Sequence, residues 1–201
     1  EIGIKTLLMD GKMRLNATWY SIEWTDIQVS QFDPVHVNFI TFIENAADAD
    51  VSGLEADMLY YPSDSLTISA AISLNDTEIV NDVAQTIPIV DIGNPLPLAP
   101  KRQGNVRIRK DLSSNQSYFQ AAVKYASSTY NSFEAAKVLD QSAYTIVDFA
   151  YGLTINDVDV EFFIRNANDE RANLYYNDQD DIPRITTNRP RNMGVRMSYR
   201  F

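Results

Sequence analysis

The sequence predicts an all-β fold in which about nine antiparallel strands form part of a transmembrane β-barrel. Apolar residues alternate with polar ones in segment after segment, whereas the spacing typical of an amphipathic helix is hard to find. The connections between the segments alternate strictly between short and long, which is the plan of outer-membrane barrels rather than of soluble sandwiches. Charge is divided in the same way, because the long connections hold 15 of the 27 acidic residues and only three of the 17 basic ones.

The first four segments are expected to form two hairpins. Residues 2–8 and 13–19 each place Ile, Leu, Met, Ala or Trp side chains on one face, and Asp10-Gly11 between them predicts a tight turn. Residues 54–60 and 66–74 alternate in the same way around a short turn that contains Pro62. A proline in a turn removes no hydrogen bond from a strand ladder.

Five further segments complete the predicted sheet: 105–109, 119–125, 147–153, 158–165 and 193–201. The last segment is the clearest, because its Met, Val, Tyr and Phe residues occupy every second position and alternate with small or cationic residues. We expect each strand to have one apolar face toward lipid and one polar face toward a wet lumen.

The connections fall into two classes. The short ones are residues 10–11, 62–65, 113–115 and 156–157, and the long ones are roughly 30–50, 75–100, 126–143 and 166–188. In an outer-membrane barrel the short turns are periplasmic and the long loops are extracellular. Alternation alone would also suit a soluble antiparallel sheet, so the order of the connections decides between the two interpretations.

Composition excludes several classes of protein. A hydrophobic share of 45% excludes a disordered chain, and the absence of cysteine excludes a disulfide scaffold, a thiolate metal site and a cysteine nucleophile. The net charge of −10 argues against binding to nucleic acid. No apolar run is long enough for a membrane-spanning helix, and no catalytic motif or cofactor-binding loop is present. We therefore expect neither an enzyme nor a cofactor.

Six motifs follow one another along the chain: Glu1–Lys5 with Asp10–Asn16, Trp24–Val29, Asn45–Ala47 with Gly53–Glu55, Ala99–Lys101, Arg165–Arg171, and Pro190–Gly194 with Tyr199–Phe201. Together they resemble the C-terminal part of a TonB-dependent outer-membrane receptor. Each motif is weak alone, but their order and spacing also match. Ala47 is a departure, because the family usually has glycine at that position.

The resemblance implies that residues 1–201 form the C-terminal portion of a 22-stranded barrel whose N-terminal plug lies outside this chain. It further implies active import of a scarce nutrient, driven by TonB and its inner-membrane energising complex acting on the plug. A ferric siderophore or another iron complex is the expected small-molecule ligand, with cobalamin and oligosaccharide as alternatives. Outer-membrane lipids and lipopolysaccharide are expected neighbours of such a barrel. The barrel assembly machinery would read Tyr199 and Phe201 as a C-terminal signal. The competing interpretation is a soluble or surface β-domain for adhesion or ligand binding.

Candidate ligand-binding residues are the aromatic residues and the single histidine of the expected outer loops. Such side chains supply apolar and stacking contacts in binding sites, but they equally serve to pack a loop. They are His36, Phe39, Phe42, Tyr130, Phe133, Tyr175 and Tyr176.

Basic residues on the expected lumen face form a second group of candidates. They could steer an anionic ligand, or they could pair with acids of the lumen or with the plug. They are Arg107, Arg109, Lys124, Arg165, Arg196 and Arg200. For metal binding the only candidates are Asp178, Asp180 and Asp181, whose spacing lacks the features of a known calcium loop, so no metal is expected.

Overall fold

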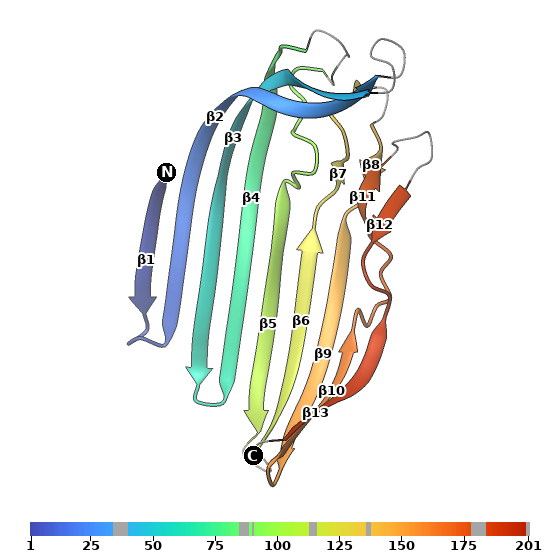
Figure 1. Ribbon diagram of the computed structural model, residues 1–201. Coiled ribbons are helices and arrows are strands. Elements are labelled where there is room, and N and C mark those ends of the chain that lie inside the picture. Colours follow the sequence, from blue (N-terminus) through green and yellow to red (C-terminus); the bar gives the residue numbers. More distant parts are fainter. Residues whose placement is uncertain are drawn as a thin grey trace.

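The computed structural model describes residues 1–33, 40–84, 89, 91–112, 116–135, 138–177 and 184–199. Nine strands form one sheet in the order β1-β2-β3-β4-β5-β6-β9-β10-β13, and every neighbouring pair is antiparallel. The sheet is open, with β1 at one edge and β13 at the other (Figure 1). These findings confirm the predicted all-β, nine-stranded antiparallel sheet. None of the described residues lies in a helix that is long and apolar enough to cross a membrane.

The strands of the large sheet are β1 (Ile2–Leu8), β2 (Met13–Asp33), β3 (Ile40–Ser63), β4 (Leu66–Asp82), β5 (Arg102–Leu112), β6 (Ser117–Ala126), β9 (Tyr144–Ile155), β10 (Val158–Arg165) and β13 (Asn192–Tyr199). Two small pairs lie in the connections: β7 (Thr129–Tyr130) with β8 (Asp140–Gln141), and β11 (Asn173–Asn177) with β12 (Arg184–Thr187).

The register separates the two faces of the sheet. One row of partners is Asn16, Asp57, Ala71, Asn105 and Lys124, and we call the face that carries it the polar face. The neighbouring row is Ala17, Ala56, Ile72, Gly104 and Tyr125, and it lies on the opposite, apolar face. The separation follows from the period of two, because successive side chains of a strand point to opposite faces.

The expected long loop 30–50 is largely strand, and the first residues of the expected loop 75–100 continue β4, so these bounds of the prediction are wrong. The ladder between β2 and β3 continues as far as Asp33 and Ile40, and β4 continues to Asp82. Bulges between Trp24 and Ile27 and between Asp48 and Ala49 shift the register. Each bulge inserts an unpaired residue and so interrupts the alternation by which strands are recognised in a sequence.

The other two long connections, 126–143 and 166–188, contain the small pairs β7–β8 and β11–β12, which the sequence did not predict. The expected turn at Asp10-Gly11 is present, with positive φ at both residues. Asn156, with a φ of 54°, begins the two-residue turn between β9 and β10. Residues 113–115 lie outside the described residues.

The largest hydrophobic cluster lies at the long-loop end of the sheet rather than in its middle. Residues 91–100 run along the part of β4 that extends past β5, with Ile79 N donating to Asn94 O at 2.8 Å and Leu96 N to Thr77 Oγ1 at 2.9 Å. We call the buried group the apex cluster. Its residues are Ile27, Ala46, Ala47, Ala49, Ile79, Ile89 and Leu96.

Candidate functional site: the polar face

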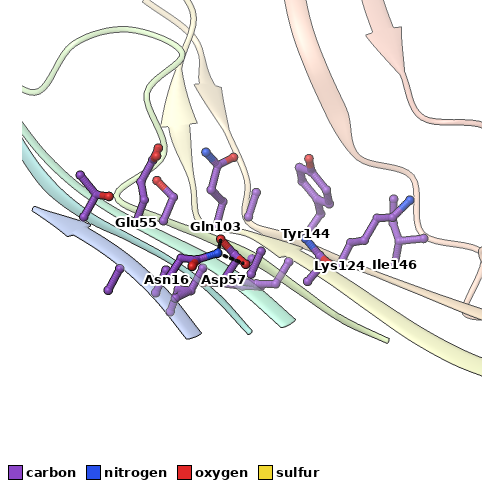
Figure 2. Close-up of a pocket in the computed structure, with 17 residues that line it drawn as sticks. Asn16, Glu55, Asp57, Gln103, Lys124, Tyr144 and Ile146 are labelled. Atoms are coloured by element: carbon purple, nitrogen blue, oxygen red, sulfur yellow. Dashed lines mark hydrogen bonds between the residues drawn. The ribbon is translucent and has the colours of Figure 1, made fainter. Parts of the chain in front are cut away.

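A hollow of about 530 Å³ occupies the middle of the polar face. Asn16 and Asp57 lie on one side of it, and Lys124 and Tyr144 lie on the other, with Gln103 between them (Figure 2). Asn16 Nδ2 donates to both carboxylate oxygens of Asp57, at 3.1 and 3.0 Å. The hollow thus has an acidic side on β2–β3 and a basic side on β6.

A chain of charged and aromatic contacts crosses the polar face from β5 to β13. The Arg109 guanidinium lies 2.9 Å from Asp111 and 3.6 Å from the centroid of the Tyr118 ring. Tyr118 donates its hydroxyl proton to Glu161 Oε2 at 2.6 Å, and Arg196 donates to Glu161 Oε1 at 3.1 Å. These five residues join four strands, and we call them the charged belt. Hydrogen bonds that involve an ionised group are the stronger kind, so the belt fixes its members' orientation.

Each predicted lumen base in the described part of the chain lies beside a partner residue on the polar face. Arg109 and Arg196 belong to the charged belt, and Lys124 lies 4.0 Å from Asp148. Arg107 Nε donates to Ser69 Oγ at 3.3 Å, and the Arg165 guanidinium lies 5.3 Å from the centroid of the Phe163 ring. Arg200 lies outside the described residues. Whether any of these bases also contacts a ligand remains a prediction.

Aromatic side chains lie over glycines on neighbouring strands, and sequence reasoning missed this feature. Tyr118 pairs with Gly152 in the register, and a Cβ atom added to Gly152 would overlap the Tyr118 ring. Phe163 pairs with Gly194, where an added Cβ would lie 2.8 Å from Phe163 Cζ. Tyr20 covers Gly53 in the same way. Each glycine leaves room for a ring to lie flat on the strand, which a longer residue would prevent.

The candidate aromatic residues have different surroundings. Tyr130 and Phe133 are half-buried against the apex cluster, and Tyr130 donates its hydroxyl proton to Pro95 O. Burial raises the pKa of Tyr130 to about 12. In β11, Tyr175 is exposed, and Tyr176 accepts a hydrogen bond from Asn173 Nδ2 at 2.7 Å. Tyr130 and Phe133 therefore pack the loop end, whereas Tyr175 has a side chain free to meet solvent.

Three further groups of predicted residues can be placed only in part. Phe42 lies in β3 opposite Gln31. His36, Phe39, Phe201, Asp178, Asp180 and Asp181 lie outside the described residues. Tyr199 is exposed on the apolar side of β13 and pairs with Val158. Among the described residues, no group of three or more His, Cys, Asp or Glu residues could hold a metal ion.

The connection after β10 is held by a compact polar cluster. Asn166 Nδ2 donates to the carbonyl oxygens of Glu170 and Arg189, both at 3.0 Å, and Asn188 Nδ2 donates to the same two oxygens. Arg191 N donates to Asp169 Oδ1 at 2.9 Å, and this hydrogen bond lowers the pKa of Asp169. The cluster ties both ends of the connection to the sheet and so positions β11 and β12.

Comparison with known families identifies this arrangement. Residues 1–167 match the family described as "TonB dependent receptor-like, beta-barrel". The chain belongs to this family. No curated protein sequence matches it. The match ends at Ala167, so it includes Asn166 of the polar cluster and the first residues of the Arg165–Arg171 element that suggested the family.

Solved siderophore and ferric-complex receptors share the fold of this chain. The siderophore receptor PiuA from Acinetobacter baumannii has a TM-score of 0.76 at 21% identity, over 97% of this chain and 27% of its own. The ferric yersiniabactin uptake receptor FyuA from Yersinia pestis has a TM-score of 0.76 at 17% identity, over 97% and 28%. The ferric-catecholate import receptor Fiu from E. coli K12 has a TM-score of 0.74 at 15% identity, over 97% and 26%. This chain thus spans about a quarter of the length of the receptors that it resembles.

Proposed function

We propose that this chain forms the C-terminal part of the barrel of an outer-membrane transporter that imports an iron–siderophore complex with energy from TonB. Family membership and the siderophore-receptor neighbours support the class of transporter. The single observation that carries the membrane location is the apolar face of a one-layer sheet. Its large side chains are exposed, and none of the described elements covers them.

The apolar face has the dimensions of a bilayer core. Arg102 and Lys110 lie on this face at the two ends of β5, and Gly104, Val106 and Ile108 lie between them. The eight residue-to-residue steps from Arg102 to Lys110 span roughly 26 Å at about 3.3 Å per step. With a strand tilt near 40° the height falls to roughly 20 Å, close to the apolar band of about 25 Å in outer-membrane barrels. Cations at both ends of the band would then lie among lipid headgroups.

Aromatic residues lie at both ends of the same band. Trp19 is in the row of Leu54, Leu74 and Arg102 at the long-loop end, and Tyr60 is in the row of Ile68 and Ile108 nearer the short turns. Trp and Tyr favour such interfacial positions. We infer that the short turns face the periplasm and that the long-loop end, with the apex cluster, faces the exterior.

The polar face would then line the lumen. Its described bases lie beside acids, rings or, for Arg107, a serine of the same wall, so they offer a fixed pattern of charge rather than mobile side chains. A ligand could meet Tyr175 and the hollow between Asp57 and Lys124. Contact with TonB and its inner-membrane complex would be made through a plug outside residues 1–201, and folding would use the barrel assembly machinery.

The proposal is tested with the intact gene in a strain that lacks its own siderophore receptors. We expect uptake of radioactive iron from at least one ferric siderophore, and we expect this uptake to disappear when TonB is deleted. Uptake that persists without TonB would contradict the energised mechanism. Uptake of cobalamin or an oligosaccharide without uptake of iron would agree with TonB-driven import but would contradict the proposed iron–siderophore ligand.

Detergent dependence separates this proposal from a soluble or surface β-domain for adhesion. A barrel with an outward apolar face should be extracted from membranes only by detergent and should precipitate when the detergent is removed. A protein that stays monomeric in plain buffer would support the soluble domain instead.

A further inference from the structure

A second cavity, of about 270 Å³, lies next to the hollow on the polar face, toward the long-loop end. Gln103 and Tyr144, both labelled in Figure 2, line the two cavities and so join them. We call this second cavity the cup. None of the described residues that line the cup is Asp, Glu, Lys, Arg or His, so a ligand meets an uncharged surface there.

Three polar side chains from separate segments converge on the cup. Gln103 lies in β5, Thr129 lies in β7, and Ser142 lies in the connection between β8 and β9. Within the described part of the chain, none of these three side chains has a hydrogen-bond partner. A few convergent polar groups in a concave site are typical of small-ligand recognition. One amide and two hydroxyl groups are therefore available to a ligand that both donates and accepts hydrogen bonds.

The apolar wall of the cup is fixed by the segment that covers the polar face. Leu98 and Leu174 line the cup and are 45% and 38% exposed. Leu98 has a φ of 57°, a conformation that is costly for a residue other than glycine and that persists only where the surroundings impose it. Leu98 N donates to Tyr130 O at 2.8 Å, and the Tyr130 hydroxyl donates to Pro95 O. A wall that is ordered in advance lowers the entropy cost of binding.

The distribution of charge disfavours an anion in the cup. The connections at the long-loop end hold 15 of the 27 acidic residues and only three of the 17 basic ones. Lys101 and Arg102 precede Gln103 but do not line the cup, because Lys101 lies 3.9 Å from Asp76 and Arg102 lies on the apolar face. A negative group in the cup would therefore lose water without gaining a cationic partner.

We propose that the cup binds the uncharged backbone of the imported iron complex, and that this complex is a ferric trihydroxamate rather than a ferric tricatecholate. Three hydroxamates neutralise the ferric ion, whereas three catecholates leave a strongly negative complex. The amide groups of a trihydroxamate chain exchange hydrogen bonds with Gln103, Thr129 and Ser142, and its methylene groups pack against Leu98 and Leu174. The inference rests on the proposed function, because it names the class of siderophore that the receptor imports.

The test measures binding to the intact receptor, purified in a neutral detergent, by quenching of its intrinsic fluorescence. Ferrioxamine B is the trihydroxamate probe, and ferric enterobactin is the tricatecholate probe. We expect ferrioxamine B to bind about tenfold more tightly or better, since the cup offers no cation to the anionic complex. Q103M and T129V, which remove hydrogen-bonding groups at similar volume, should each weaken ferrioxamine B about two- to tenfold. Q120M is the matched control, because Gln120 pairs with Arg109 on the polar face and does not line the cup.

The outcomes separate this inference from the proposed function. Tighter binding of ferric enterobactin would overturn the inference, and so would wild-type affinity for ferrioxamine B in both Q103M and T129V or an equal loss in Q120M. TonB-dependent uptake of iron from the tricatecholate alone would leave the proposed function standing and reject the trihydroxamate. If no iron complex is imported, the proposed function fails and the inference fails with it. Urea-unfolding midpoints equal to that of the wild type exclude misfolding, and either variant suffices if the other is unstable.

Discussion

Replacing Gly152 with alanine tests how the polar face is held together. An added Cβ would overlap the Tyr118 ring, so the ring must move away from the strand. That movement breaks the 2.6 Å hydrogen bond to Glu161 and the stacking of Arg109 over the ring at 3.6 Å. Overpacking costs about 1–3 kcal/mol, and a hydrogen bond to a charged group contributes about 1.5–3 kcal/mol. Replacing glycine with alanine also reduces the conformational entropy of the unfolded chain, which regains up to about 1 kcal/mol and leaves a net loss of about 1.5–5 kcal/mol.

The assay is urea unfolding of the purified barrel in detergent, followed through the midpoint. Gly3→Ala is the matched control. Gly3 lies in edge strand β1, where an added Cβ would meet Thr18 Oγ1 at 3.1 Å, a tight contact with a side-chain oxygen that can rotate away, and Ala17 O at 3.5 Å, an ordinary van der Waals distance. It should change stability by about 0.5 kcal/mol or less. If the ring is the cause, G152A should cost much less in a Y118A background, with a coupling energy of about 1 kcal/mol or more. Strictly additive effects, or a G152A midpoint equal to that of wild type, would refute the reasoning.

Three further predictions concern the loop end and the apolar face. The hydrogen bond from Arg191 lowers the pKa of Asp169, so the stability that this carboxylate confers is present above the usual aspartate pKa and is lost as pH falls through the lower folded value. Hydrogen exchange of the connection after β10 should therefore rise only in that acid range, and D169N should abolish this pH dependence. Y130F removes the hydrogen bond to Pro95 O and should lower local stability by about 1–3 kcal/mol, measured as faster proteolysis of the loop that contains Pro95. Absorbance titration of the wild type should show one tyrosine that ionises near pH 12. Brominated lipid should quench Trp19 fluorescence, and W19F should remove that quenching; equal quenching in W19F would place another residue in the lipid.

The parts of the strands near the short turns could be predicted, because each has one apolar face and one polar face. Their side chains alternate, and their positions in the register follow from tight turns such as Asn156-Asp157. The upper parts of β2, β3 and β4 could not be predicted in this way. There the polar-face positions, such as Ala49 and Ile79, are buried under residues 91–100, so the alternation disappears where a loop returns to cover the sheet.

The contacts of the candidate site were less predictable than its residues. Arg109, Lys124 and Arg196 were expected on one face by periodicity, but their partners depend on the register between strands that are far apart in sequence. The pairing of Glu161 with Gly152 follows from a two-residue turn and was within reach. The approach of Tyr118 to both residues depends on the β6–β9 pairing across a long connection, which no local signal specifies.

These contacts change how the lumen bases should be understood. A base free in a water-filled lumen would attract anions from a distance and would lose that effect in salt. Arg196 is instead bound to Glu161, and Arg109 is bound to Asp111, so their net field is small while their orientation is fixed. Such a wall selects by geometry at short range rather than by steering. Glu161→Gln should then increase anion attraction and its salt dependence while it lowers stability, and an uptake rate that is equally insensitive to salt in both proteins would contradict this view of the charged belt.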